Sequence, residues 1–230
     1  MNPPTRLVEV RQKVLKQNDI VARELRERFQ NEGVFVVSLV SSPGTGKTAF
    51  LERVLTTLRP RYRVAALVGD LATDNDARRL ARSNVPVKQI ITGTVCHLEA
   101  EMIRTALSGW IPDRLEILFI ENVGNLVCPS SYDLGEDLRL VLMSVTEGED
   151  KPLKYPTIFN TADAAVITKL DLAQAVEFDF NAANENIQAV RPGMTVLSVS
   201  AKTGQAMDEF MSFLESRVSA AAQKYAGAAK

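Results

Sequence analysis

The sequence has few of the side chains that form disulfide frameworks and large metal sites. Its 230 residues include two cysteines and one histidine. Two cysteines cannot form the multi-bridge framework of a small secreted domain, so we expect a protein of the reducing cytoplasm. The sequence also has no apolar run long enough to cross a bilayer and no signal-peptide pattern. We therefore expect no membrane association.

A large net charge of either sign is also missing. The chain has 27 basic and 28 acidic residues, so no overall field attracts nucleic acid, and we expect no nucleic-acid partner. No internal repeat is visible. Hydrophobic residues make up 46% of the chain, which is enough for one sizeable core. The composition therefore predicts one α/β domain.

Short apolar runs alternate with amphipathic stretches along most of the chain. This alternation predicts an α/β fold in which a mostly parallel β-sheet is covered by helices on both faces. Right-handed crossovers then bring the loops that follow the strands to one rim of the sheet, where ligands bind. We expect strands at residues 34–40, 64–68, 87–91, 115–120, 138–145, 164–167 and 195–199, and helices at 49–58, 75–83, 98–107, 177–190 and 206–221.

The regions outside this alternation carry their own patterns. In residues 1–33, apolar side chains at spacings of three, four and seven predict an amphipathic helix packed on the core. The nucleotide-binding domain then spans residues 34–220. Residues 146–161 contain two prolines and are expected to form a long functional loop. The alanine-rich residues 221–230 are expected to be a flexible tail. The apolar stripe of the first helix comprises Leu7, Val10, Val14, Val21, Leu25 and Phe29.

A glycine-containing octapeptide, residues 41–48, lies between a predicted strand and a predicted helix. Gly-Lys-Thr at the start of a helix is typical of a phosphate-binding P-loop, in which backbone N–H groups and the helix N-terminus attract phosphates. Ser41 replaces the expected first glycine, but it only begins the turn. An ordinary turn with incidental glycines is the alternative, and Lys-Thr directly after Gly46 argues against it. The predicted phosphate-binding residues are Ser42, Pro43, Gly44, Thr45, Gly46, Lys47 and Thr48.

Carboxylates follow two other predicted strands. Glu121, with Gly124 three residues later, resembles the D-x-x-G motif of GTPases with Glu in place of Asp. We expect Thr48, Asp70, Asp76 and Glu121 to hold Mg²⁺, and the Gly124 N–H to contact the γ-phosphate. Lys47, Asp76 and Glu121 are the predicted catalytic residues. The alternative is that Glu121 merely ends its strand, that Asp74 caps the next helix, and that the remaining carboxylates are solvated.

Two further segments predict recognition of guanine. Thr168-Lys169-Leu170-Asp171 resembles the N-K-x-D motif with Thr in place of Asn. The Asp171 carboxylate can accept two hydrogen bonds from guanine, whereas adenine lacks the N1–H group. Ser200-Ala201-Lys202 resembles the S-A-K element of GTPases. We therefore expect GTP and GDP as ligands, with Thr168, Lys169, Asp171, Ser200, Ala201 and Lys202 around the base, and looser support of the base loop without the Asn amide.

Cys96, His97 and Cys128 are the candidate metal ligands. Thiolate and imidazole suit both Ni²⁺ and Zn²⁺, but three ligands leave a tetrahedral site one short. The alternative is that the two cysteines are buried as small apolar residues. Any movement of Gly124 with the γ-phosphate would pass through residues 125–127 to Cys128. The sequence therefore suggests the hypothesis that the nucleotide state sets the metal geometry.

Several stretches together resemble one family, the HypB family of nickel-incorporation GTPases in [NiFe]-hydrogenase maturation. The resemblance covers most of residues 34–204, and its most specific parts are GDLAT at 69–73, CHLEA at 96–100, FIENVGNLVCP at 119–129 and SVTEGEDKP at 144–152. It implies that Cys96, His97 and Cys128 bind metal at an interface of a homodimer that GTP promotes. It also implies that Lys151 and Lys154 contact the second chain, that Asp76 and Glu121 lie near Mg²⁺, and that the partners are a hydrogenase large-subunit precursor and a nickel-maturation protein.

The sequence departs from many members of that family because neither cysteine nor histidine occurs before Cys96. We therefore expect no additional N-terminal nickel site and no storage role. We also see no glutamine placed to orient water and no obvious arginine finger, so intrinsic hydrolysis should be slow. The alternatives are a urease-type nickel chaperone, a P-loop kinase or ATPase with structural cysteines, and a nucleotide-dependent binding module without catalysis.

Overall fold

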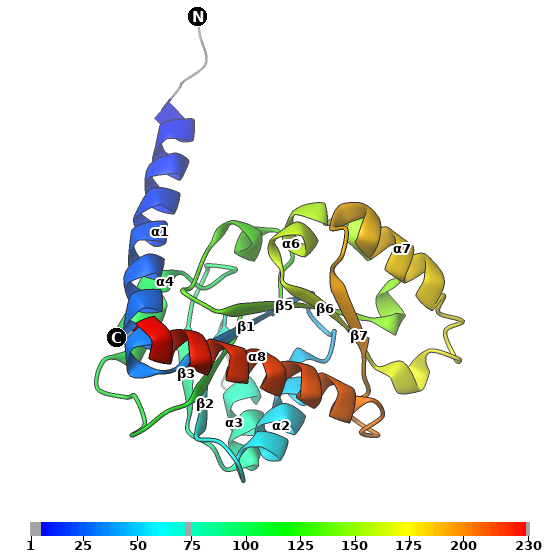
Figure 1. Ribbon diagram of the computed structural model, residues 1–230. Helices are drawn as coiled ribbons and strands as arrows, with labels where there is room; N and C mark the ends of the chain where they lie inside the picture. The colour runs from blue at the N-terminus through cyan, green and yellow to red at the C-terminus, as the bar shows by residue number, and fades with distance from the viewer. Residues whose placement is uncertain (1–5, 72–74, 229–230) are drawn as a thin grey trace, which may run out of the picture.

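The structure is a computed structural model that describes residues 6–71 and 75–228. Its described strands form a seven-stranded sheet in the order β3-β2-β4-β1-β5-β6-β7, and all neighbouring pairs are parallel (Figure 1). This confirms the predicted α/β class. The strands are β1 (Phe35–Ser41), β2 (Val64–Asp70), β3 (Val87–Ile91), β4 (Ile117–Glu121), β5 (Leu138–Ser144), β6 (Ala164–Thr168) and β7 (Thr195–Ser198).

Helices cover both faces of the sheet. They are α1 (Arg6–Glu32), α2 (Lys47–Leu58), α3 (Asn75–Leu80), α4 (Ala100–Leu107), α5 (Lys151–Lys154), α6 (Pro156–Thr161), α7 (Phe180–Val190) and α8 (Met207–Ala228). Side chains of a strand alternate between faces, so Val37 and Leu39 pack with residues of α2 and α8, while Val36 packs with residues of α1 and α4. A third core cluster joins β5 and β6 to α6 and α7.

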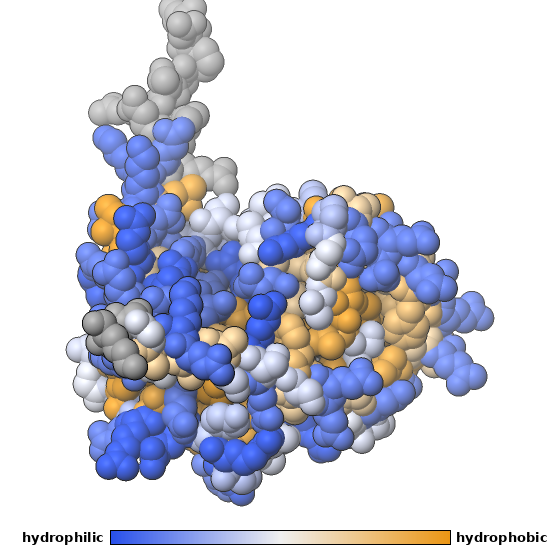
Figure 2. Space-filling view, viewed as in Figure 1, coloured by the Kyte–Doolittle hydropathy of each residue, from blue (hydrophilic) through white to orange (hydrophobic). Residues whose placement is uncertain are grey.

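The first helix packs on the body along only part of its length. Val21, Leu25 and Phe29 are buried, as the apolar stripe predicts. Val14 is 43% exposed and Ile20 is 50% exposed, and Figure 1 shows the N-terminal half of α1 standing away from the domain. Figure 2 shows apolar side chains among hydrophilic ones beside this projecting part. The expectation that the whole helix packs on the core is therefore wrong for its first half.

The expected loop at residues 146–161 is largely helical. It contains the 3₁₀ turn η3 (Val145–Glu147), followed by α5 and α6. Pro152 and Pro156 lie at the first positions of these helices, where the missing N–H group removes no intrahelical hydrogen bond. Ile158 and Phe159 are fully buried. The prolines therefore begin helices here, and the prediction of a structureless loop is wrong.

The expected flexible tail is also helical as far as the structure describes it. Helix α8 continues to Ala228, in keeping with the high helix propensity of alanine. The Tyr225 hydroxyl donates a hydrogen bond to Asp137 Oδ1 at 2.5 Å, which ties this end of the helix to the start of β5. Among the described helices, none is both long enough and apolar enough to span a membrane.

Candidate functional site

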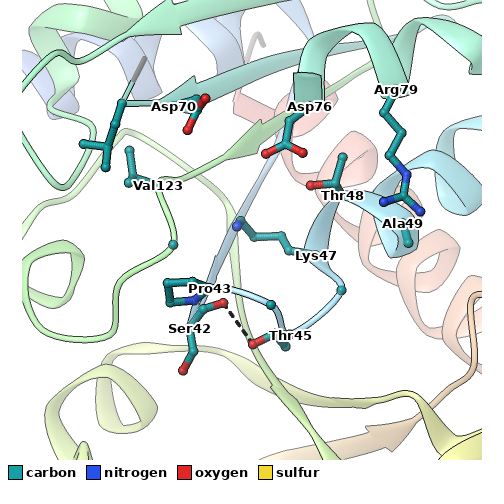
Figure 3. A pocket seen from close by; sticks show the side chains of 14 residues that line it. Ser42, Pro43, Thr45, Lys47, Thr48, Ala49, Asp70, Asp76, Arg79 and Val123 are labelled. Atoms are coloured by element: carbon teal, nitrogen blue, oxygen red, sulfur yellow. Dashed lines mark hydrogen bonds between the residues drawn. The ribbon is translucent and has the colours of Figure 1, made fainter. Parts of the chain in front are cut away.

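The turn between β1 and α2 forms the floor of an open pocket. Gly44 and Gly46 have φ values of +78° and +94°, in the left-handed region that favours glycine. Helix α2 begins at Lys47, so its N-terminal N–H groups face this turn. The pocket has a volume of about 430 Å³ (Figure 3). Its lining includes all seven residues predicted to bind phosphate, together with Asp70, Asp76, Arg79 and Gly124.

Glu121 lies at the end of β4 and is 1% exposed. Its Oε1 atom accepts a hydrogen bond from the Thr48 hydroxyl at 2.7 Å and lies 3.5 Å from Lys47 Nζ. Burial raises the pKa of Glu121, and the Lys47 ammonium and the Thr48 hydroxyl oppose that shift. Its buried Oε2 atom has no hydrogen-bond partner among the described residues. A buried carboxylate oxygen without a partner, beside a threonine hydroxyl, fits a Mg²⁺ site.

Two acidic side chains line the pocket itself. Asp70 ends β2 and Asp76 lies in the first turn of α3, and both line the pocket. Figure 3 shows Asp76 beside Thr48. Ala72, Thr73 and Asp74, which include the proposed helix cap, lie outside the described residues.

Arg79 is a residue of this pocket that the sequence analysis missed. It lines the pocket from α3, and its Nε atom lies 3.1 Å from Glu52 Oε2 of α2. Arg79 lies three residues after Asp76, so both side chains lie on one face of the helix. This spacing in the sequence could have identified Arg79 as a pocket residue.

Gly124 contacts the P-loop directly. A Cβ atom on Gly124 would lie 3.1 Å from both the Cα and N atoms of Pro43. The segment after β4 therefore lies against the phosphate-binding turn without space for a side chain, and a contact of the Gly124 N–H with a γ-phosphate stays a prediction.

A second cavity, of about 220 Å³, continues from the P-loop toward the ends of β6 and β7. Asp171 lines it, and its Oδ1 atom accepts a hydrogen bond from the Ser200 hydroxyl at 2.5 Å. Ser200 is fully buried and does not line the cavity; it orients Asp171 instead. The other predicted base-binding residues, Thr168, Lys169, Ala201 and Lys202, line this cavity together with Thr45, Gly46 and Phe50.

Two side chains hold the P-loop at Thr45. The Thr168 hydroxyl lies 2.6 Å from the Thr45 carbonyl oxygen, to which it donates a hydrogen bond. Thr168 therefore ties β6 to the P-loop despite replacing the expected asparagine, and looser support of the base loop stays a prediction. Glu147 accepts a hydrogen bond from the Thr45 hydroxyl at 2.8 Å and another from the Ser144 N–H at 3.1 Å. The Ser-x-x-Glu spacing of a capping box was the available signal for Glu147.

The structure brings Cys96, His97 and Cys128 together. Their ligand atoms all lie within 4.8 Å of one another, and the two Sγ atoms are 2.9 Å apart. Neither ring nitrogen of His97 has a hydrogen-bond partner among the described residues, although Nε2 lies 3.3 Å from Glu99 Oε1 without hydrogen-bond alignment. The Tyr132 ring packs on His97 with 4.0 Å between centroids. A half-buried imidazole with unbonded nitrogens beside two thiols fits a divalent metal ion such as Zn²⁺ or Ni²⁺.

The protonation of His97 suits a ligand. Burial lowers the pKa of His97, and the nearby Glu99 carboxylate opposes this effect. The neutral imidazole, which has a free electron pair for a metal, is therefore favoured near neutral pH.

The segment after β4 joins the nucleotide pocket to this Cys–His–Cys centre. Asn122 is 2% exposed, and its Oδ1 atom accepts a hydrogen bond from the Leu98 N–H at 3.0 Å. Asn125 donates from Nδ2 to the Cys96 carbonyl oxygen at 3.2 Å. Residues 121–128 therefore begin with a buried carboxylate that is hydrogen-bonded to Thr48 of the nucleotide pocket and end with a thiol ligand. Asn122 and Asn125 between them contact the loop that holds the remaining ligands.

The two lysines expected at a dimer interface lie on α5. Lys154 Nζ pairs with Asp150 Oδ2 at 2.6 Å, and the Lys151 ammonium lies 5.3 Å from the centroid of the Tyr155 ring. Both contacts lie within the short segment 150–155, and a role of these lysines between two chains stays a prediction.

The fold and the pockets define a P-loop nucleotide-binding protein with an adjoining Cys–His–Cys centre. The model of the family described as "CobW/HypB/UreG, nucleotide-binding domain" matches residues 35–198. The chain belongs to the HypB family. It is 44% identical over 210 residues to the hydrogenase maturation factor HypB of Rhizobium leguminosarum bv. viciae, covering 91% of this chain and 70% of that protein.

Relatives from Helicobacter pylori agree with this assignment. The chain is 42% identical over 212 residues to the hydrogenase/urease maturation factor HypB of strain 26695, covering 90% of this chain and 86% of that protein. A crystal structure of HypB from Helicobacter pylori in complex with nickel matches with a TM-score of 0.82 and 42% identity, covering 88% of this chain and 95% of that one. The predicted family is thereby confirmed.

Proposed function

We propose that this protein is a GTP-hydrolysing metallochaperone that binds nickel and delivers it during the maturation of a [NiFe]-hydrogenase. The observation that carries the proposal is the continuity of residues 121–128, in which Glu121 contacts the pocket residues Thr48 and Lys47, Gly124 lines the phosphate pocket, and Cys128 belongs to the Cys–His–Cys centre. A protein that only hydrolysed nucleotide would have no need of this connection. The nickel complex of the related Helicobacter pylori protein supports nickel as the cargo.

The nucleotide occupies the two joined cavities in this proposal. The P-loop N–H groups and Lys47 bind the phosphates, and Asp171 accepts hydrogen bonds from the guanine ring. Thr48, Glu121, Asp76 and Asp70 would hold Mg²⁺, which supplies positive charge to the phosphate oxygens. Among the described residues, no glutamine lines the pocket and Arg79 is paired with Glu52, so intrinsic hydrolysis is slow in this proposal.

Gly124 carries the nucleotide state to the metal centre. A γ-phosphate bound at the P-loop lies next to the contact between Gly124 and Pro43. A shift of Gly124 moves Asn125 and Cys128 with it, and Asn125 is bonded to the backbone of Cys96. The distance between the two thiols then depends on which nucleotide is bound. Such control requires two populated conformations with different metal affinity.

A second copy of the chain completes the metal site. Each chain supplies two thiols and one imidazole, whereas Zn²⁺ and Ni²⁺ take four or more ligands in most protein sites. Val127, adjacent to Cys128, is 62% exposed, so an apolar side chain is available for a contact beside the metal centre. We propose that GTP promotes this pairing, that Lys151 and Lys154 contact the second chain, and that hydrolysis releases the metal to a hydrogenase precursor with the help of a nickel-maturation protein.

A urease is the second candidate client. The relative from Helicobacter pylori is described as a hydrogenase/urease maturation factor, so one protein of this family is associated with both enzymes. The metal chemistry is the same for either client, and the two are separated by adding each apo-enzyme precursor to the nickel-loaded protein and measuring nickel transfer.

The experiment that tests the proposed function is a Ni²⁺ titration of metal-free protein loaded with either GDP or a non-hydrolysable GTP analogue. Nickel stoichiometry and oligomeric mass are measured on the same samples. We expect a nucleotide-dependent nickel affinity and a dimer with the GTP analogue. Cys128→Ala should lose most nickel binding and keep its GDP affinity, whereas Ser131→Ala, an exposed control three residues away, should match the wild type. Nickel binding that ignores both the nucleotide and Cys128 would refute the proposal.

A further inference from the structure

Helix α1 has one buried polar residue on its apolar face. Among its residues from Gln12 to Glu32, Asn18 is the only polar side chain that is buried, at 6% exposure. Its position lies on the apolar stripe, four residues after Val14, three before Val21 and seven before Leu25. A polar side chain on a packed helix face is costly unless its groups are hydrogen-bonded, so its partners reveal why it is there.

Both polar groups of Asn18 bind backbone atoms of distant segments. Its Oδ1 atom accepts a hydrogen bond from the Ala100 N–H at 2.9 Å, and its Nδ2 atom donates to the Asp133 carbonyl oxygen at 2.8 Å. Ala100 is the first residue of α4, and the preceding Glu99 makes no side-chain cap. Asn18 therefore supplies from another helix the acceptor that the N-terminus of α4 lacks.

Each of these two segments begins at a metal-ligand candidate. Ala100 comes three residues after His97, and Asp133 comes five residues after Cys128. The residue before Asp133 is Tyr132, whose ring packs on His97. Arg26, two turns further along α1, holds the Asp133 carboxylate at 2.6 and 2.8 Å. Helix α1 thus fixes the two segments relative to each other through Asn18 and Arg26.

We propose that Asn18 is a positioning residue of the Cys–His–Cys centre. A metal-binding histidine is usually oriented by a hydrogen bond from its second ring nitrogen. Neither ring nitrogen of His97 makes a hydrogen bond among the described residues, and the nearest carboxylate, Glu99 Oε1, lies 3.3 Å from Nε2. The orientation of His97 therefore depends on the backbone at residues 96–100, which carries Glu99, and on the Tyr132 ring. Asn18 sets the position of both through Ala100 and Asp133. This inference rests on the proposed metal-binding function and assigns part of that site to α1.

The test compares Asn18→Ala with Asn31→Ala, an exposed asparagine in the last turns of the same helix, and with the wild type. Nickel affinity is measured with GDP bound, and X-ray absorption determines whether imidazole remains a nickel ligand. We expect Asn18→Ala to weaken nickel binding by about 10–100-fold, as loss of an outer-shell partner of a metal site does, and to reduce the imidazole signal. GDP affinity should stay within about twofold, because α1 contributes no residue to the nucleotide cavities. Asn31→Ala should match the wild type in all measurements.

A second variant tests the two contacts of Asn18 separately. Asn18→Asp keeps an acceptor for the Ala100 N–H but sets a carboxylate oxygen against the Asp133 carbonyl oxygen, and we expect this repulsion at a buried position to weaken nickel binding at least as much as alanine does. If Asn18→Ala fails to bind GDP, its fold is lost, and nickel affinity is measured in Asn18→Asp and Arg26→Ala instead. Wild-type nickel affinity in both of these variants overturns the proposal. Wild-type affinity and ligand set in a folded Asn18→Ala protein overturn the role of Asn18 alone. No nickel binding by the wild type overturns the metal centre and this inference with it.

Discussion

Thr168→Val removes the hydroxyl that joins β6 to the P-loop. Thr168 is 3% exposed, and its Oγ1 atom lies 2.6 Å from the carbonyl oxygen of the fully buried Thr45. Valine has nearly the same shape, so little packing is lost. The change leaves a buried carbonyl without this donor, which costs about 1–3 kcal/mol. The substitution therefore separates the hydrogen bond from the packing around it.

The expected effects follow from that cost. A destabilisation of about 1.5 kcal/mol lowers Tm by about 3–6 °C in a domain of this size. Thr45 lines both nucleotide cavities, so a displaced P-loop also weakens GDP binding, by up to about tenfold if about 1.4 kcal/mol of positioning is lost. Tm is measured by calorimetry of the nucleotide-free protein, and GDP affinity by titration calorimetry.

Two further variants interpret the result. Thr168→Ser keeps the hydroxyl and should recover most of both values. Thr56→Val removes a hydroxyl that is bonded to the Glu52 carbonyl oxygen at 2.8 Å on the exposed side of α2, and it should change Tm by less than about 1 °C. A Thr168→Val protein with the Tm and GDP affinity of the wild type would refute the idea that this threonine takes over the support of the P-loop.

Three other predictions concern different parts of the molecule. Lys47→Ala should abolish GTP hydrolysis in a phosphate-release assay, because it removes the cation 3.5 Å from Glu121 in the phosphate pocket; unchanged turnover would disprove the assignment of the P-loop. Asp171→Asn should lower GTP affinity about 100-fold or more and reduce the preference over ATP, since two hydrogen bonds to a charged acceptor contribute about 1.5–3 kcal/mol each; intact selectivity in competition titrations would contradict it. Tyr225→Phe should lower the free energy of unfolding by about 1 kcal/mol in urea, because Asp137 loses a hydrogen bond, and no change would mean that the end of α8 frays.

The sequence determines the features that depend on neighbouring residues. Strands of a parallel sheet that are buried on both faces are mostly apolar along their length. The apolar runs in the sequence were therefore enough to locate β1 and β5. The P-loop needs glycines at two left-handed positions and Lys-Thr at the start of a helix, and these requirements lie within residues 44–48. Residues that follow the predicted strands could also be assigned to one pocket, because the carboxyl ends of parallel strands lie at the same edge of the sheet.

Local sequence patterns were misleading where one residue type is compatible with two kinds of local structure. Prolines end many helices, but Pro152 and Pro156 are the second residue of α5 and the first of α6, where the N–H groups of a helix have no partner to lose. The alanine-rich end of the chain was expected to fray, yet Tyr225 anchors it through a hydrogen bond to a residue 88 positions away. In both cases the missing information was what the segment packs against.

The tertiary structure alone decided which distant groups meet. Thr168 bonds Thr45 across 123 positions, and Asn18 bonds Ala100 across 82. The sequence named Cys96, His97 and Cys128 as candidates, but only the fold brings their ligand atoms within 4.8 Å of one another. A hydrogen bond depends on tenths of an ångström, whereas separation along the chain constrains distance only loosely once the chain is compact. Sequence patterns therefore determined the elements and their chemistry, and packing of the helices on the sheet determined the contacts between them.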